Sequence, residues 1–286
     1  MVDTKKNINL TFSQRNGLQS IPPQLELNEV SDEFRRLLQY YIDLDMQQAT
    51  VGGYPDYCFV DHWKRISKDF HVRFLKQPYG TYINSYPEFR TTVETIVCAR
   101  EYNLIFDLIE FLVGHKDCNN ELAHKLNGLF EETRSAYRLY GVTIIPVGTE
   151  EQANALQLAI DDADKNGSGS IRNQLIEAGQ ELRNGNWAAS VRHSIHAVEA
   201  TAVLLTPDAP KADTLGAALN VLKNQGRLRH EGLKKAFSAL YGYTSDEEGI
   251  RHATVFNSEA DVDEADALFM HGACASFISY LLAQQR

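Results

Sequence analysis

Apolar residues recur at helical spacing along most of the chain. The clearest run lies at 187–205, and comparable runs lie at 31–42, 104–112 and 261–284. A period of three to four residues places the apolar side chains on one face of a helix, where they can pack against other helices. The pattern therefore predicts a mainly α fold.

One segment has the alternation of strands instead of the period of a helix. Residues 137–147 carry β-branched and aromatic side chains on both sides of Gly141, which predicts a short hairpin or two small strands. Thr149 is then a good N-cap with acidic residues after it. We therefore expect a helical first domain with a small β element (1–148), followed by a helical bundle (149–286).

The second domain should contain one helix before residue 166 and six helices after residue 170. Gly242 is typical of a helix end and Ser245 of a helix start, so we expect a break between them. The NGSGS sequence at 166–170 predicts a flexible loop. The expected helices lie near 171–183, 187–205, 213–225, 231–242, 247–255 and 261–284.

Composition mainly excludes classes of protein. The chain is 43% hydrophobic and 23% charged, as in a globular protein, and we find no apolar run of membrane-spanning length and no signal peptide. The four cysteines have no C-x-x-C pairing, which argues against zinc and against a disulfide framework. We therefore expect a cytoplasmic protein without a membrane partner, a metal or a cofactor. No P-loop, G-x-S-x-G or H-E-x-x-H motif occurs either.

The charge is acidic, which limits any contact with nucleic acid. The net charge is −10, divided as −3 for residues 1–148 and −7 for residues 149–286, so neither half has the basic surface of a general nucleic-acid binder. RNA would have to bind at a local patch. One basic cluster is present, and it is either such a patch or a solvated helix start. Its members are Arg227, Arg229, His230, Lys234 and Lys235.

The helix expected at 187–205 carries a polar line beside its apolar stripe. Arg192, His196 and Glu199 follow the same steps of four and three, about one residue round the helix from the core positions. At the edge of a core, these groups could bind phosphate and move protons, or they could form a salt-bridged surface. The core stripe consists of Val191, Ile195, Val198, Ala202 and Leu205.

The segment YGYTSDEEGIRHA at 241–253 concentrates unlike chemistry in few residues. An aromatic helix end and an acidic turn precede Arg251 and His252. A guanidinium can hold two phosphate oxygens, and an imidazole titrates near neutral pH. The pair is therefore either a functional site or part of a solvated, capped helix.

FSQRNGL (12–18), AASVRHSIHAVEATAVLL (188–205) and several further segments resemble those of the AbiJ-type abortive-infection proteins, which join an N-terminal domain of their own class to a HEPN domain. The first half is similar to that N-terminal domain at FSQRNGL (12–18), LIFDLIEFLVG (104–114), LNGLFEETRSAYRLYG (126–141) and TIIPV (143–147). The second half resembles HEPN domains at AASVRHSIHAVEATAVLL (188–205), DTLGAALNVLKNQG (213–226), LKKAFSALYGYTSDEEGIRHA (233–253) and DEADALFMHGACASFISYLL (263–282).

The resemblance implies an antiphage function. HEPN ribonucleases cleave RNA without a metal at the cleft of a dimer, using an Arg followed a few residues later by a His. It implies a homodimer through the second domain, Arg251 on the phosphate, and His252 or His196 as acid or base. Glu199 would orient the His or Arg192.

One departure from the HEPN pattern keeps a second hypothesis open. The positions at which a HEPN domain would place its His hold Phe256, Asn257 and Ser258. The chain is therefore either an RNA-cleaving or RNA-binding defence protein, or an inert interaction or regulatory subunit of a defence or toxin–antitoxin system. In both cases the first domain would sense, regulate or hold a protein partner.

Overall fold

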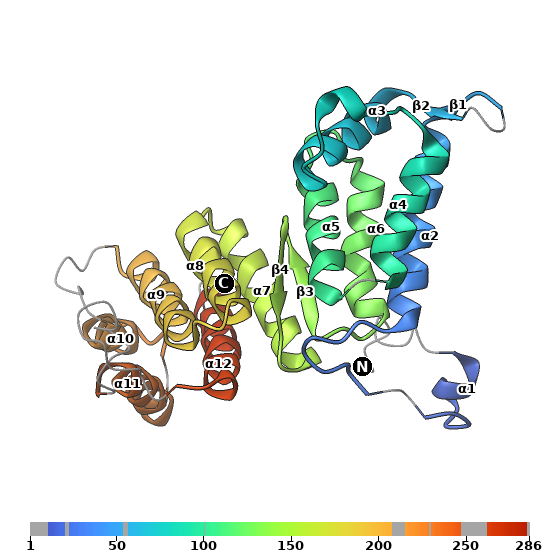
Figure 1. Ribbon diagram of the computed structural model, residues 1–286. Coiled ribbons are helices and arrows are strands. Elements are labelled where there is room, and N and C mark those ends of the chain that lie inside the picture. The colour runs from blue at the N-terminus through green and yellow to red at the C-terminus, as the bar shows by residue number, and fades with distance from the viewer. Residues whose placement is uncertain are drawn as a thin grey trace. The chain divides into compact units, whose positions relative to one another are not determined.

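The protein is mainly α-helical. The computed structural model describes residues 11–20, 23–53, 57–99, 101–207, 215–228, 230–246 and 262–284. It is 70% helical, with twelve helices and only two-stranded sheets in this part of the chain, which confirms the expected fold class (Figure 1). The chain divides into two compact units, Met1–Ile144 and Ile145–Arg286. The roles expected for domains meeting near residue 148 stay predictions.

The first unit is built around α2, α4, α5 and α6, which lie side by side in Figure 1. Phe34 at the start of α2 is fully buried, and its ring lies 5.2 Å from that of Phe130 on α6. Ser31 accepts a hydrogen bond from the Phe34 amide, which confirms that residue as the helix N-cap. The elements are α1 (Phe12–Arg15), α2 (Asp32–Gln48), β1 (Thr50–Val51), β2 (Cys58–Phe59), α3 (Asp61–Asp69), the π-helix η1 (Phe70–Phe74), the 3-10 helix η2 (Tyr79–Thr81), α4 (Tyr86–Ala99), α5 (Tyr102–Gly114), α6 (Asn120–Glu132) and β3 (Tyr137–Tyr140).

Two small sheets accompany these helices. The predicted hairpin is present as β3 and β4 (Thr143–Pro146), with Gly141 at a φ of 64° between them. The other sheet was not predicted. In it, antiparallel β1 and β2 pair Thr50 with Phe59. Strands of two residues are too short to show an alternation, so the sequence pattern could not reveal them.

The second unit is a helical bundle. Figure 1 shows α8 and α9 beside each other, with α12 packed against α7, α8 and α9. The five residues of the expected α9 stripe are all buried, and Thr149 caps α7 in a capping box with Gln152, so both expectations are confirmed. The helices are α7 (Glu150–Lys165), α8 (Gly169–Arg183), α9 (Trp187–Leu205), α10 (Leu215–Asn224), α11 (Glu231–Asp246) and α12 (Glu264–Ala283).

The expected break at Gly242 is wrong. Helix α11 continues through this glycine and through Ser245 to Asp246. A glycine inside a helix costs about 1 kcal/mol relative to alanine, which the surrounding helix can absorb. The helix expected at 247–255 lies outside the described residues, and so do Arg251 and His252.

Helix α12 is more apolar than expected, since the sequence pattern indicates no apolar run of membrane-spanning length. By length and composition it could cross a membrane, and it is the one described helix that could. In the structure, 56% of its 18-residue apolar window is buried inside the protein, as in the core helix of a bundle.

Candidate functional site on helices α8 and α9

Helix α9 presents the expected polar line at the edge of the core. Arg192 and Glu199 are half-buried, and His196 is exposed. Because the three residues follow helical steps of four and three, they lie on one side of α9. The line beside the apolar stripe is therefore present, with His196 open to solvent.

Arg192 is the unusual member of this line. Its Nε atom is buried and has no hydrogen-bond partner among the described residues. A guanidinium stays charged, and burying part of it without a partner is unfavourable. An anion that accepted hydrogen bonds from Arg192 would remove that cost.

His193, which the sequence analysis passed over, lies next to this line. Its Nδ1 is 2.9 Å from Oε1 of Gln174 and 3.2 Å from Oε2 of Glu177, both on α8. Both neighbouring oxygens are acceptors, so Nδ1 carries the proton and donates it to Oε1 of Gln174, with the Glu177 carboxylate beside it as an ion-pair partner. In the neutral ring, Nε2 is then the acceptor. The His193 side chain is 26% exposed, so part of the ring is open to solvent.

The two histidines of α9 lie close together. The ring centroids of His193 and His196 are 6.1 Å apart, and the rings are nearly perpendicular, at 84°. Their spacing of three residues is visible in the sequence, but it does not by itself distinguish His193 as a candidate. The α8–α9 surface thus combines a cation that could bind an anion with two groups that can transfer protons.

The predicted basic cluster is only partly available for ligands. Arg227 donates from Nη1 to the backbone oxygen of Leu205, 3.0 Å away, and so satisfies a carbonyl at the end of α9. On α11, Lys234 is half-buried and Lys235 is exposed. Arg229 lies outside the described residues. Binding of RNA by these residues stays a prediction.

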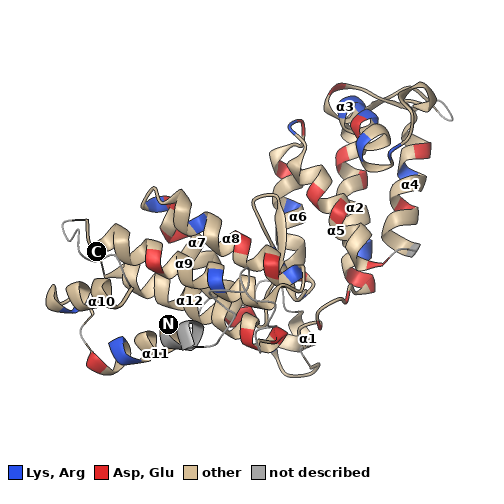
Figure 2. Cartoon of the chain, turned by 60° about the vertical axis from the view of Figure 1, so that its left-hand side comes forward, with Lys and Arg blue, Asp and Glu red and all other residues tan. Residues whose placement is uncertain are grey.

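Basic and acidic residues are mixed along the described helices (Figure 2). Figure 2 shows lysine and arginine interspersed with aspartate and glutamate along the described helices. In the same part of the chain, no group of three His, Cys, Asp or Glu side chains is placed to hold a metal ion. A polyanion would therefore contact a small region of this surface.

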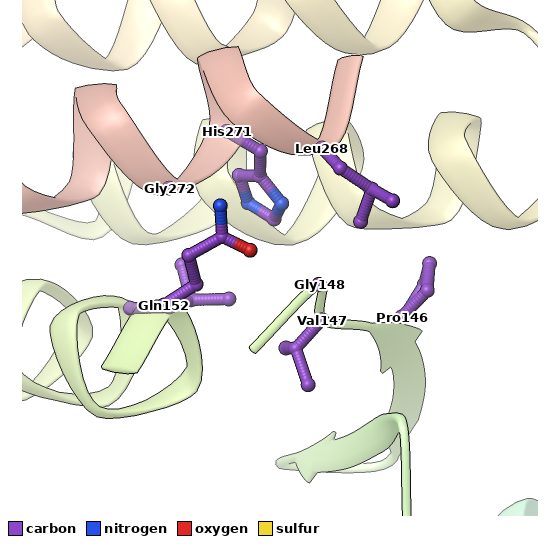
Figure 3. A pocket seen from close by; sticks show the side chains of 8 residues that line it. Pro146, Val147, Gly148, Gln152, Leu268, His271 and Gly272 are labelled. Carbon is purple, nitrogen blue, oxygen red and sulfur yellow. The ribbon is translucent and has the colours of Figure 1, made fainter. Parts of the chain in front are cut away.

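A small cavity between α7 and α12 is a packing feature. It measures about 10 Å³, room for about one water molecule. Figure 3 shows Gln152 of α7 reaching toward His271 and Gly272 of α12. Burial lowers the pKa of His271 to about 4, so the ring is neutral, and its Nε2 donates to the Leu175 carbonyl 3.1 Å away. This histidine therefore holds helices together.

A larger apolar groove lies between α11 and α12. Its volume is about 510 Å³, and the side chain of Phe269 at its wall is 55% exposed. Asp266 is the one charged residue among those that line it, and Lys235 is exposed on the same α11 helix. The other lining residues are Ala236, Ala239, Leu240 and Met270.

A buried carboxylate organises one end of the first unit. Asp45 of α2 accepts hydrogen bonds from Trp63 of α3 and from Asn119, which caps α6. His62 also lies beside it, at 3.5 Å. Because Asp45 is buried and has several donors, it connects three parts of this unit.

The comparison with known families shows the family to which the chain belongs. The family model described as AbiJ N-terminal domain 4 matches residues 10–162, more than half of the chain. The chain belongs to this AbiJ family. Membership indicates a function in abortive infection, the sacrifice of an infected cell that stops phage. The match ends inside α7, so it does not extend to the HEPN-like segments. No curated protein and no solved structure matches the chain.

Proposed function

We propose that this AbiJ-family protein acts in antiphage defence by binding and cleaving RNA with its second unit. The observation that carries the proposal is the buried Nε of Arg192, which has no hydrogen-bond partner among the described residues and lies one helical turn from the exposed His196. A phosphodiester supplies the anion that Arg192 lacks. The resemblance of this half to HEPN domains supports RNA as the source of that phosphodiester.

The chemistry needs only groups that protein and RNA provide. Arg192 binds the scissile phosphate, and histidine moves the protons, while the ribose 2′-hydroxyl is the nucleophile. Glu199 positions His196 or Arg192 from the next turn of α9. Arg251 and His252 are assigned to the same chemistry by sequence alone.

Cleavage of a fluorescent single-stranded RNA in EDTA tests this function. The full chain should cleave, and Arg192→Ala should lower the rate at least ~10²-fold, the range for loss of a group that binds or protonates the reacting atoms. Arg172→Ala is the matched control, because Arg172 contacts Asp164, 3.6 Å away, and its loss removes the same charge from the same unit. Equal background cleavage by all three proteins would refute the enzyme. Activity that disappears in EDTA would refute the metal-free reaction.

A second function, that of an inert interaction subunit, is favoured because basic side chains in this region already have partners within the protein. Arg227 of this cluster is bonded to the Leu205 carbonyl, and Lys223, which lies just before the cluster in the chain, is bonded to Glu231. Tight complex formation with a protein, without binding or cleavage of RNA, would support this alternative. The first unit would then hold the partner, as it would also do in an active enzyme.

The same proposal includes a homodimer formed through the second unit. Phe269 of each copy would enter the groove beside Ala236 and Ala239 of the other. Phe269→Glu should convert a dimer into a monomer in sedimentation experiments. Val203→Glu is the control, because Val203 is 58% exposed elsewhere in this unit. A monomeric wild-type protein at micromolar concentration would refute the dimer.

A further inference from the structure

We infer that His193 is the general base, and His196 the general acid, of the RNA cleavage proposed above, on which this inference rests. Residues of helix α8 hold the ring of the general base, His193, in position. Gln174 and Glu177 are three residues apart on that helix, and both place an oxygen within hydrogen-bond distance of the same His193 nitrogen. Because α8 and α9 pack along each other, the ring is held by a second element of the bundle.

The hydrogen bonds fix which nitrogen can accept a proton. With Nδ1 donating to Oε1 of Gln174 and lying 3.2 Å from the Glu177 carboxylate, the lone pair of His193 is on Nε2. No described residue donates to this atom. When Nε2 takes a proton, the Glu177 carboxylate stabilises the positive charge of the imidazolium and keeps its orientation. His193 therefore has the arrangement of a base, and Glu177 is its positioning residue.

His196 is suitably placed for the second proton transfer. Its exposed ring lies 6.1 Å from that of His193. Two hydrogen bonds of ~2.8 Å, one to each of two oxygens on a single phosphate, can span such a separation. Arg192 lies one turn before His196 on the same side of α9, where its guanidinium can hold the non-bridging oxygens. The three side chains can therefore surround a single phosphodiester.

The reaction that these groups support is an internal transfer. Nε2 of His193 takes the proton of the 2′-hydroxyl as the 2′-oxygen forms a bond to phosphorus. The bond from phosphorus to the 5′-oxygen breaks, and His196 gives that oxygen a proton. The products are a 2′,3′-cyclic phosphate and a 5′-hydroxyl end. Exchange with water then returns both histidines to their starting states, so no metal, oxidant or other co-reactant is consumed.

Two substrates distinguish the base from the acid. On ordinary RNA, His193→Gln and His196→Gln should each lower kcat by ~10²–10⁴-fold. In a substrate with sulfur in place of the scissile 5′-oxygen, the leaving thiolate needs no proton. That substrate should restore cleavage to His196→Gln and leave His193→Gln slow. His124→Gln, an exposed histidine on α6, is the matched control and should behave as wild type.

The possible outcomes distinguish a failure of this inference from a failure of the proposed RNA cleavage. If wild type does not cleave RNA, the proposed function fails. If Arg192→Ala abolishes cleavage while His193→Gln keeps the wild-type rate, only this inference fails. Restoration of His193→Gln rather than His196→Gln by the sulfur substrate would also overturn it, because the roles would be reversed.

A measurement on the resting protein tests the positioning of His193 without any substrate. Nitrogen-15 spectra should show the neutral ring of His193 protonated on Nδ1 in wild type and in Glu177→Gln, which keeps an oxygen acceptor. Glu177→Leu should reduce that tautomer and lower kcat, and Glu177→Gln should recover part of the rate. A His193 ring protonated on Nε2 in wild type would overturn the assignment.

Discussion

The indole Nε1 of Trp63 donates a 2.7 Å hydrogen bond to Oδ2 of Asp45 inside the first unit. Both side chains are buried, and Asp45 also receives a hydrogen bond from Asn119. A buried carboxylate is tolerated when donors surround it and becomes costly when they are removed. This pair should therefore be a large local contribution to the stability of the first unit.

A double-mutant cycle measures that contribution. Asp45→Ala should lower the free energy of unfolding by ~2–4 kcal/mol, because it leaves the indole N–H buried without an acceptor. Combined with Trp63→Phe, it should give a coupling energy of ~1.5–3 kcal/mol, the range for a hydrogen bond to a charged group. Urea unfolding followed by circular dichroism provides the values. Glu94→Ala, at an exposed position of α4, should change little. Additive effects of Asp45→Ala and Trp63→Phe would contradict the prediction.

Gly179 of α8 has no room for a side chain. A Cβ atom there would lie 2.6 Å from Cδ1 of Ile145, far inside normal contact. We expect Gly179→Ala to lower the free energy of unfolding by ~1–3 kcal/mol through overpacking. Gly169→Ala on the same helix is the control, because nothing lies within 4 Å of its Cβ position and alanine favours helix. Ile145→Ala, made together with Gly179→Ala, should cost less than the sum of the two changes. Full additivity would show that the two sites do not clash.

His271 should make the second unit less stable in mild acid. Its pKa is lowered by burial from 6.5 to about 4, so between these values the unfolded chain binds the proton and the folded protein does not. The stability that the neutral His271 ring contributes is fully present above pH 6.5 and is lost as the pH falls through about 4. The free energy of unfolding should fall by about 3 kcal/mol over this range. His271→Leu should remove this part of the pH dependence in urea unfolding, whereas His124→Gln should retain it. An unchanged pH dependence in His271→Leu would be evidence against a neutral buried ring.

The salt dependence of RNA binding separates the basic residues of the second unit. Lysines that contact phosphates release counterions, so the double variant Lys234→Ala, Lys235→Ala should reduce the slope of log K against log salt by ~1.4 for a single strand. Arg227→Ala should instead lower the free energy of unfolding by ~1 kcal/mol, because its guanidinium satisfies the Leu205 carbonyl. If the double variant has the same slope as wild type, Lys234 and Lys235 do not contact RNA phosphates.

Local patterns predicted the elements better than the contacts between them. The apolar stripe of α9 and the N-cap at Thr149 are repetitive or short-range signals, and both are in the structure. The continuation of α11 through Gly242 depends on the surrounding helix, which a local cap signal does not include.

The candidate site was predictable in the same uneven way. Arg192 and His196 are visible as steps along one helix. His193 becomes chemically distinct only because Gln174 and Glu177 approach it from α8, 19 and 16 positions earlier in the chain. Sequence spacing within α9 could not reveal those partners, and without them His193 resembles any other surface histidine.

Gln152 also decides where this protein can be divided. Its Oε1 accepts a hydrogen bond from the Thr149 amide at the start of α7, while its side chain leaves so little space at Gly272 that a Cβ there would lie 2.7 Å from Cγ. The first turn of α7 and the packing of α7 against α12 thus both depend on the Gln152 side chain. A gene fragment ending at residue 162, where the family match stops, would keep most of α7 and lose the helix that covers it. Such a fragment would present the apolar face of α7 to water and should self-associate, so a fragment meant to stand alone should end before α7.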